Sequence, residues 1–311
     1  MRNFTFKGLF LAAMFMVLGS LAIQAADNGL ITRQVTVKVY EAGTLSEKIA
    51  YKMYKITNLK IIGEINGTDL RVIREMAGNA FGHDTDGKLS VLDLSDAKIV
   101  KGGDFYYEAD LEYNGTHEYE CYYTSNDKIG DYAFFRCSGL TSLTLPSGVT
   151  EIGDYAFYGC SGLTSLTLPS GVTEIGSRAF SGCSGLTSLT LPSSLTSIGD
   201  RAFRGCSGLT SIYVYTEKLP SIGSDVFYGC NAKKCTVYVP KGTYDDYWLS
   251  EFSYFENIVE FEATGINNVI TSNDAKELSR YSVNGQRLSA PTKGLNLVKY
   301  SDGSVKKVAV Q

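Results

Sequence analysis

The stretch CSGLTSLTLPSGVTEIG occupies residues 137–153 and recurs letter for letter at residues 160–176. A close variant, CSGLTSLTLPSSLTSIG, occupies residues 183–199, and CSGLTSIYVY begins at Cys206. Each copy therefore starts 23 residues after the previous one. Self-similarity at a fixed period of this size predicts an array of stacked structural units.

Each unit reads C-x-x-L-x-x-L-x-L-P, then a loop with one aliphatic residue, then I-G-[D/S]-x-A-F. The L-x-x-L-x-L core at this period is typical of a leucine-rich solenoid. Between residues 163 and 168, Leu166 and Leu168 alternate with Ser165 and Thr167, as in a strand with one buried face. Pro169 ends this strand because it cannot donate a hydrogen bond. We therefore expect a parallel β-sheet on the concave face.

The second half of each unit predicts a short helical turn on the convex face. The residue after Ile-Gly is always one that caps a helix start, namely Asp131, Asp154, Ser177, Asp200 or Ser224. The fold class is thus an α+β repeat. One coil alone exposes most of its apolar side chains, so coils are expected to be stable only when stacked on similar coils.

The array extends beyond the perfect copies. Ile56-x-x-Leu59-x-Ile61 and Leu89-x-x-Leu92-x-Leu94 fit the strand pattern, and residues 69–76 read as an amphipathic helix after the cap candidate Thr68. At the other end, residues 237–240 predict a last strand and residues 243–255 a lid. We expect an N-terminal cap over 26–57 and a solenoid over 58–261. The solenoid is divided into an irregular part (58–127), regular repeats (128–240) and a C-terminal cap (241–261).

The remaining segments are a linker at 262–280 and a tail at 281–311. In the tail, Asn284-Gly285 and Asp302-Gly303 are strong hairpin turns, which predict a small antiparallel β module.

Residues 1–25 read as a cleaved secretory signal, with a basic start, an apolar run and a small-residue exit. No cysteine precedes Cys121, so we expect no lipoprotein anchor, and no later segment is apolar enough for a membrane span. The expected location is secreted or at the outer cell surface. The formal charge of −4 becomes −6 without Arg2 and Lys7, which disfavours nucleic acid as a partner.

The cysteines Cys137, Cys160, Cys183 and Cys206 occupy one repeat position, which favours a ladder of buried free thiols over disulfides. Cys230 and Cys235 break the period. They are the pair expected to bond if any disulfide exists, which would leave Cys121 over.

No catalytic, cofactor or metal site is predicted. His83 and His117 are the only histidines, and they lie in different irregular segments. Asp84-x-Asp86-Gly87 begins like a calcium loop but lacks its further acidic ligands. A carbohydrate-active enzyme with an acidic pair in the irregular region stays open as an alternative, as does a purely structural or antigenic spacer.

Two surfaces are candidates for ligand binding. The first is the outward face of the strands, with hydroxyl columns that either suit an exposed strand or form a docking face; its residues are Ser142, Thr144, Ser165, Thr167, Ser188, Thr190, Ser211 and Tyr213. The second is the tyrosine-rich insertion at 102–128, which is either a binding loop or a packing flap. Its candidate contacts are Tyr106, Tyr107, Tyr119, Tyr122 and Tyr123.

The motifs C-x-x-L-x-x-L-x-L-P and I-G-x-x-A-F resemble the BspA-like leucine-rich repeat of bacterial surface proteins, over about residues 58–261. The tail is similar to the C-terminal sorting domains of the type IX secretion system. These resemblances imply a curved solenoid that binds a protein or glycan ligand at the cell surface, with adhesion to host matrix or to other cells. Oligomeric state is not implied.

Overall fold

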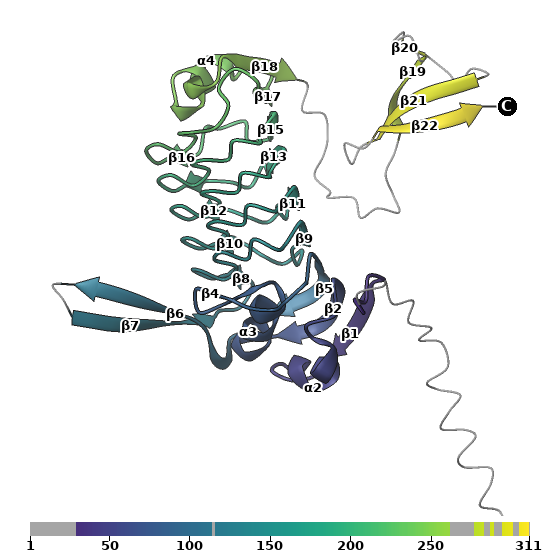
Figure 1. Cartoon of the computed structure of the whole chain (residues 1–311). Helices are drawn as coiled ribbons and strands as arrows, with labels where there is room; N and C mark the ends of the chain where they lie inside the picture. Colours follow the sequence, from purple (N-terminus) through teal and green to yellow (C-terminus); the bar gives the residue numbers. More distant parts are fainter. Residues whose placement is uncertain are drawn as a thin grey trace, which may run out of the picture.

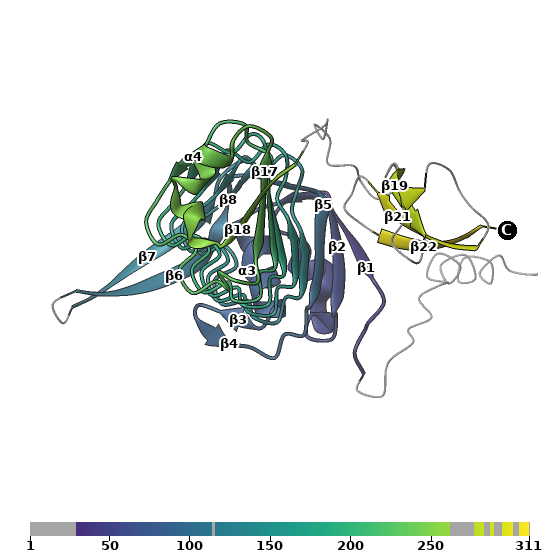
Figure 2. The same cartoon turned by 90° about the horizontal axis from the view of Figure 1, so that it is seen from above.

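The computed structural model describes residues 29–113, 116–261, 277–282, 287–288, 294–300 and 305–310. Within them, residues 29–261 form an elongated stack of coils (Figure 1). Seen along the stack, the regular coils superimpose on one another (Figure 2). The solenoid predicted from the repeat is therefore confirmed. The expected signal, 1–25, lies outside the described residues.

One side of the stack is a parallel ladder of strands, which we call the main sheet. Its first part has the order β1-β2-β5-β9-β11 and its second part β13-β15-β17-β18. The strands are β1 (Val35–Val39), β2 (Asn58–Ile65), β5 (Val91–Ile99), β9 (Ser142–Thr144), β11 (Ser165–Thr167), β13 (Ser188–Leu191), β15 (Ser211–Val214), β17 (Thr236–Pro240) and β18 (Asn257–Phe261). Asn58 lies beside Val91, 33 residues further on, which is also the spacing of the two irregular leucine patterns. The register shifts after Lys60, and from Ile62 onward the paired residues are 34 apart.

The sheet is longer at both ends than the sequence predicted. The expected N-terminal cap contributes β1, which pairs in parallel with β2. Residues 237–240 are not the last strand, because β18 pairs in parallel with β17. Both additions lie in segments without the leucine pattern.

A second parallel sheet of two-residue strands runs along the stack in the order β16-β14-β12-β10-β8. The strands are β8 (Lys128–Ile129), β10 (Glu151–Ile152), β12 (Glu174–Ile175), β14 (Ser197–Ile198) and β16 (Ser221–Ile222). The expected helical turns after them are absent from residues 128–240, where the chain forms hydrogen-bonded turns instead.

The turns replace helices because their backbone bonds to the next coil. Phe134 N–H donates to Ala156 C=O at 2.6 Å, and Phe157 N–H to Ala179 C=O at 2.6 Å. The residue after the capping position has φ of +53 to +57° at Tyr155, Arg178 and Arg201, which is incompatible with a continuing right-handed helix.

The Asp side chains therefore cap the neighbouring coil and not a helix. Asp131 Oδ1 accepts from Asp154 N–H at 2.7 Å, and Asp154 Oδ1 accepts from Ser177 N–H at 2.6 Å. These side chains accept from backbone N–H groups, as predicted. The N–H groups belong to the next coil, however, and not to the first turn of a helix.

The core between the two sheets is built from stacked equivalent side chains. Five phenylalanine rings form one column with centroids 5.0 to 5.9 Å apart and planes within 10° of parallel: Phe134, Phe157, Phe180, Phe203 and Phe227. Such stacking requires neighbouring coils to match, which accounts for the near-identical copies.

The cysteine column is hydrogen-bonded to the phenylalanine column. Cys160 Sγ donates to Phe134 C=O of the preceding coil at 3.1 Å, and the next two cysteines repeat this bond at 3.2 Å. All seven cysteines lie in the described residues and all are free thiols. Burial raises the pKa of Cys183 to about 12, so the thiols stay protonated donors.

The conditional disulfide between Cys230 and Cys235 is not formed, and both residues are buried. Cys230 Sγ instead donates to Phe203 C=O at 3.3 Å. It continues the ladder although its spacing in sequence breaks the period.

Close contact between coils fixes one glycine of each repeat. A Cβ on Gly185 would lie 2.5 Å from Ser161 O, and the equivalent Gly162 and Gly208 would meet backbone oxygens just as closely. Only glycine lets the coils approach at this position.

The N-terminal part adds short helices beside the sheet: α2 (Leu45–Ile49), η1 (Ala50–Lys52) and α3 (Gly67–Met76), followed by strands β3 (Asn79–Ala80) and β4 (His83–Asp84). The predicted helix is α3, but its cap is Asn66 and not Thr68. Asn66 and Asp69 form a capping box. Asn66 Oδ1 accepts from Thr68 N–H at 3.0 Å, and Asp69 Oδ2 accepts from Asn66 N–H at 3.1 Å.

The insertion is an antiparallel hairpin, which we call the arm, with strands β6 (Gly102–Tyr113) and β7 (Thr116–Thr124). It projects sideways from the stack where the irregular coils meet the regular ones (Figure 1).

The C-terminal end carries α4 (Tyr244–Trp248) and η2 (Glu251–Tyr254). Phe252 and Phe255 contact the last ring of the column, Phe227, with centroids 4.9 and 5.0 Å away.

The tail forms an antiparallel sheet of order β20-β19-β21-β22. Its strands are β19 (Glu277–Ser282), β20 (Arg287–Leu288), β21 (Gly294–Tyr300) and β22 (Val305–Val310). The predicted Asn-Gly and Asp-Gly turns lie outside the described residues. The tail sheet starts at Glu277, inside the expected linker.

Candidate binding surface

The outward side chains of the main sheet form two columns in register, as the sequence predicted. Ser142 lies beside Ser165 and Thr144 beside Thr167. Ser188 lies beside Ser211, and Thr190 lies beside Tyr213. Each of these residues except Ser165, whose side chain lies outside the described part, is exposed or half-buried. We call this surface the hydroxyl face.

The hydroxyl face continues onto strands that the sequence analysis did not include. Tyr213 lies beside Tyr238 of β17, and Tyr238 lies beside Val259 of β18. The alternation in Val237-Tyr238-Val239 carried the signal for Tyr238, because the two valines are buried and the tyrosine between them points outward.

Two threonine positions of the repeat hold the coils together. One is the Thr150 column, in which Thr173 Oγ1 donates to Thr150 C=O at 3.1 Å and Thr196 Oγ1 donates to Thr173 C=O at 2.9 Å. The other is the Thr141 column. Thr164 Oγ1 donates to Thr141 C=O at 3.0 Å, and Thr210 Oγ1 donates to Thr187 C=O at 3.0 Å. In contrast, no hydroxyl of the Thr144 column makes a hydrogen bond within the described part of the chain. These hydroxyls are available to a ligand.

Tyr213 and Tyr238 form the aromatic end of the hydroxyl face. Their rings are stacked with centroids 4.6 Å apart and planes 7° from parallel. Burial, and then the neighbouring Tyr238, raise the pKa of Tyr213. Tyr213 therefore keeps its proton and remains a hydrogen-bond donor at neutral pH.

The opposite end of the hydroxyl face is charged but internally paired. Lys60 Nζ lies 3.0 Å from Asp93 and 2.8 Å from Asp96. Hydrogen bonds to Asp96 and Asp93 raise the pKa of Lys60. The surface thus passes from an ion-paired end, through uncharged threonines, to two tyrosines.

The arm divides the five predicted tyrosines into two groups. Tyr106 and Tyr107 are buried, so their prediction as ligand contacts was wrong. Tyr119 and Tyr123 are 64% and 56% exposed and remain candidates, while Tyr122 is half-buried at the base. The arm is therefore a packing flap at its base and an exposed surface beyond it.

Tyr106 completes the first regular coil. In later coils the carbonyls of this turn accept N–H groups from the preceding coil, as Asp154 C=O does from Tyr132 N–H at 2.9 Å. The first coil has no such neighbour. Tyr106 Oη supplies the missing donor to Asp131 C=O at 2.7 Å.

Arg74 of α3 completes the same row of carbonyls. Its side chain is fully buried, and Nη1 donates to Ala133 C=O at 3.0 Å while Nη2 lies 3.4 Å from Phe135 C=O. The guanidinium also lies over the ring of Tyr107, 4.7 Å from its centroid. Tyr106 and Arg74 have no counterparts in the later coils, so the repeat pattern of the sequence did not point to them.

The outer arm is strongly acidic. Residues 102–124 contain no Lys or Arg and six carboxylates, which are Asp104, Glu108, Asp110, Glu112, Glu118 and Glu120. His117 Nδ1 pairs with Asp110 at 2.8 Å. An acidic surface of this kind is electrostatically complementary to a basic one.

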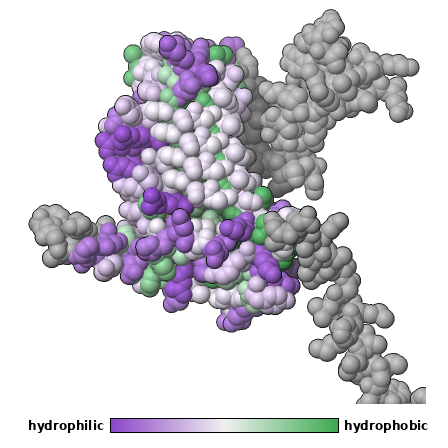
Figure 3. All heavy atoms as spheres, viewed as in Figure 1, coloured by the Kyte–Doolittle hydropathy of each residue, from purple (hydrophilic) through white to green (hydrophobic). Residues whose placement is uncertain are grey.

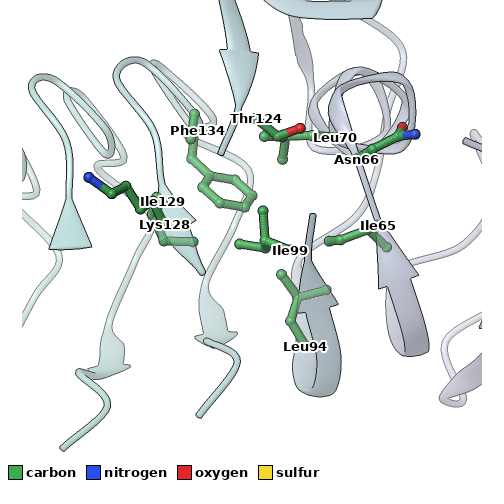
Figure 4. A pocket seen from close by; sticks show the side chains of 10 residues that line it. Ile65, Asn66, Leu70, Leu94, Ile99, Thr124, Lys128, Ile129 and Phe134 are labelled. Carbon is green, nitrogen blue, oxygen red and sulfur yellow. The ribbon is translucent and has the colours of Figure 1, made fainter. Parts of the chain in front are cut away.

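A small cavity lies where α3, β2 and β5 meet the first regular coil (Figure 4). Its volume is about 10 Å³, and its lining is mostly apolar, with Ile65, Leu94 and Phe134 among the side chains. No Asp or Glu lines it, so it does not supply the acidic pair of the enzyme alternative. Among the described residues, no group of three or more His, Cys, Asp or Glu could hold a metal ion. No helix of the described part is long and apolar enough to cross a membrane.

Comparison with known proteins gives matches of two kinds. Residues 127–250 match the family described as BspA type leucine-rich repeat region, in six copies. No curated protein matches the chain.

Among solved structures, a Treponema pallidum leucine-rich repeat protein is 32% identical, with 45% of this chain and 64% of that one covered and a TM-score of 0.35. A leucine-rich repeat protein from Bacteroides ovatus is 22% identical, with coverage of 68% and 55% and a TM-score of 0.35. The pneumococcal vaccine antigen PcpA is 16% identical, with coverage of 76% and 61% and a TM-score of 0.36. The chain thus spans less than two thirds of the length of each of these proteins. On the motifs, the geometry and the family match together, residues 127–250 are a BspA-type leucine-rich repeat region.

Proposed function

We propose that this protein binds another protein at the bacterial surface through the hydroxyl face, with Thr144, Thr167, Thr190, Tyr213 and Tyr238 as the central contacts. The observation that carries the proposal is that some threonine hydroxyls of the repeat bond the next coil, whereas those on the hydroxyl face do not. The Thr141 column stabilises the stack, whereas the Thr144 column makes no hydrogen bond to the described chain. A repeated, uncharged row of free donors and acceptors suits a ligand that lies along the sheet.

The geometry of the tyrosine pair favours a protein over a glycan. Sugars bind tyrosine by stacking on the face of the ring, but the facing sides of Tyr213 and Tyr238 cover each other at 4.6 Å. The pair therefore offers ring edges and phenol groups to a ligand. Tyrosines used in this way are typical of protein recognition surfaces.

The exposed part of the arm is a second contact region, with Tyr119 and Tyr123 among acidic side chains. It projects away from the main sheet (Figures 1 and 2), so it would contact a partner independently of the hydroxyl face. Because its charge is of one sign, it would speed association with a basic partner and make that association salt-dependent.

A surface location is supported by the BspA-type repeats and by the predicted signal at residues 1–25. PcpA is titled a vaccine antigen, which agrees with a surface role for such proteins. Adhesion to host matrix or to other cells is the role we propose within this location. The function of the tail as a type IX sorting domain stays a prediction.

The test is a binding screen of the mature chain against arrays of extracellular-matrix proteins, mucins, bacterial surface proteins and glycans. Tyr213→Ser with Tyr238→Ser is the test variant, and Tyr119→Ser with Tyr123→Ser is the matched variant on the arm. We expect a protein ligand whose affinity falls at least about tenfold in the sheet variant, as at an interface hot spot. Binding to glycans alone, or a protein ligand unaffected by the sheet variant, would contradict the proposal.

A further inference from the structure

Within the described residues, no strand pairs with the outer edge of the main sheet at either end. β1 is the outermost strand at one end and β18 at the other. Figure 1 shows no described strand beyond either of them. The α4–η2 segment covers the ring of Phe227 but leaves β18 accessible, with Asn257, Val259 and Glu260 exposed. An open edge strand carries backbone groups ready to pair with another strand, and proteins usually protect it.

Both ends also expose large apolar side chains. At the N-terminal end, Tyr40 and Tyr51 are each 82% exposed. At the C-terminal end, Leu249 is 84% exposed, and Trp248, the only tryptophan of the chain, is 44% exposed.

The regular coils between the two ends differ in this respect. In residues 128–240 the only exposed large apolar residue of the described part is Tyr228. In Figure 3 the flank of these coils is mostly pale, whereas hydrophobic and hydrophilic residues are mixed at the C-terminal end. Exposed apolar side chains gathered at the ends of the stack indicate that the ends are interaction sites.

The two ends carry opposite charge. Residues 29–57 contain five basic and two acidic side chains. Residues 241–261 contain five acidic side chains and a single basic one, Lys241. On β1, Lys38 is exposed, and at the other end Asp245 and Glu256 are exposed. Surfaces of opposite sign steer each other into contact and oppose the pairing of like ends.

We propose that the partner of each end is the opposite end of a second copy of this chain, so that copies join head to tail. β1 of one copy lies in parallel beside β18 of the next and continues the main sheet, while Tyr40 and Leu249 become buried. The pairing that continues the outward columns places Thr36 beside Val259, because both point to the hydroxyl face. Such a contact does not close on itself, and it therefore builds open strings with a longer hydroxyl face. This inference is independent of which ligand the hydroxyl face binds.

The test measures sedimentation velocity of the mature full chain over a range of concentrations at low and high salt. We expect a series of species beyond the dimer that grows with concentration and shrinks at high salt, because salt screens exposed charges over about 10 Å at 0.1 M. A monomer at every concentration in low salt would overturn the proposal, as would a dimer without larger species. Those results would point to a closed pair or to a β18 edge covered by the chain's own tail.

Two end variants sharpen the test. Lys38→Glu with Tyr40→Ser blocks the N-terminal end, and Leu249→Ser with Val259→Lys blocks the C-terminal end; all four side chains are exposed, and thermal unfolding checks that both variants fold. Each variant alone is expected to be monomeric, with a dissociation constant raised by at least about tenfold. Mixed together they should form one-to-one dimers and nothing larger, because one sound end of each kind remains. Tyr119→Ser on the arm is the control and should assemble like the wild type. A mixture that stays monomeric, or an end variant that assembles like the wild type, would refute the head-to-tail contact.

Discussion

Replacing Tyr106 by phenylalanine tests whether the first regular coil needs its substitute neighbour. The change removes only the hydroxyl that donates to Asp131 C=O at 2.7 Å, and the buried ring stays in place. A carbonyl that loses its partner in a poorly solvated site costs about 1–3 kcal/mol. Because Asp131 is half-buried, water can replace part of the bond, and we expect the free energy of unfolding to fall by about 1–2 kcal/mol.

The measurement is urea unfolding of the mature chain, followed by far-ultraviolet circular dichroism. The neighbouring Tyr107→Phe is the matched control, because Tyr107 is also buried and its hydroxyl makes no hydrogen bond within the described residues. It should change stability by less than about 0.5 kcal/mol. If both variants lose the same stability, or neither loses any, the hydrogen bond from Tyr106 to Asp131 C=O does not stabilise the first regular coil.

Four further predictions concern the stacking of the regular coils. Cys183→Ala should lower stability by about 1 kcal/mol in urea unfolding, because Phe157 C=O loses the thiol donor at 3.2 Å; equal stability would remove the role of the cysteine column. Arg136→Gly should raise it by up to about 1 kcal/mol, because φ at Arg136 is +57° where later coils have glycine; a loss would mean that the side chain matters more than the backbone. Burial raises the pKa of Tyr132 to about 12, so its contribution to stability is full below pH 10 and lost as pH rises towards 12, and Tyr132→Phe should flatten that decline in an alkaline titration. Deleting residues 160–182 removes one whole coil and should leave a folded, less stable chain with a smaller urea m-value, whereas deleting half as many residues should prevent folding.

The parts of the fold that recur were predictable, because each repeat reports the same environment again. Leu166 in β11 and Leu168 directly after it are both buried, as the alternation predicted. The cysteine ladder was also predictable, since four equal positions must share one environment. What the spacing did not reveal was the bond from each thiol to the phenylalanine carbonyl of the preceding coil, which depends on the path of the turn.

The preference of a single side chain could not show which backbone N–H group it would bind. Asp154 prefers to accept from exposed N–H groups, and that preference is met equally by the first turn of a helix or by the next coil. The structure selects the next coil, because backbone N–H groups of the turn are already committed along the stack. The helix expected from the cap was therefore wrong, although the role of the side chain was not.

The arm shows why composition alone could not assign its tyrosines. Tyr106 and Tyr107 are adjacent in sequence and identical in chemistry to Tyr119 and Tyr123, yet only the first pair is buried. Their fate depends on where the hairpin leaves the stack and on Arg74, a residue far away in sequence. A feature that occurs once gives no internal copy against which to compare it.

The ends and the middle of this protein are under different physical constraints. A middle coil can be copied because each donor and acceptor that it presents meets an equivalent group on the next coil. The first turn lacks that match, and Tyr106 and Arg74 provide it from outside the repeats. At the other end Tyr254 Oη accepts from Gly229 N–H at 3.2 Å and donates to Cys230 C=O at 3.0 Å. Since these residues contact only the first and last coils, coils can be gained or lost between them without disturbing either end. Duplication therefore changes the length of the hydroxyl face while the capping side chains and the two open sheet edges stay the same.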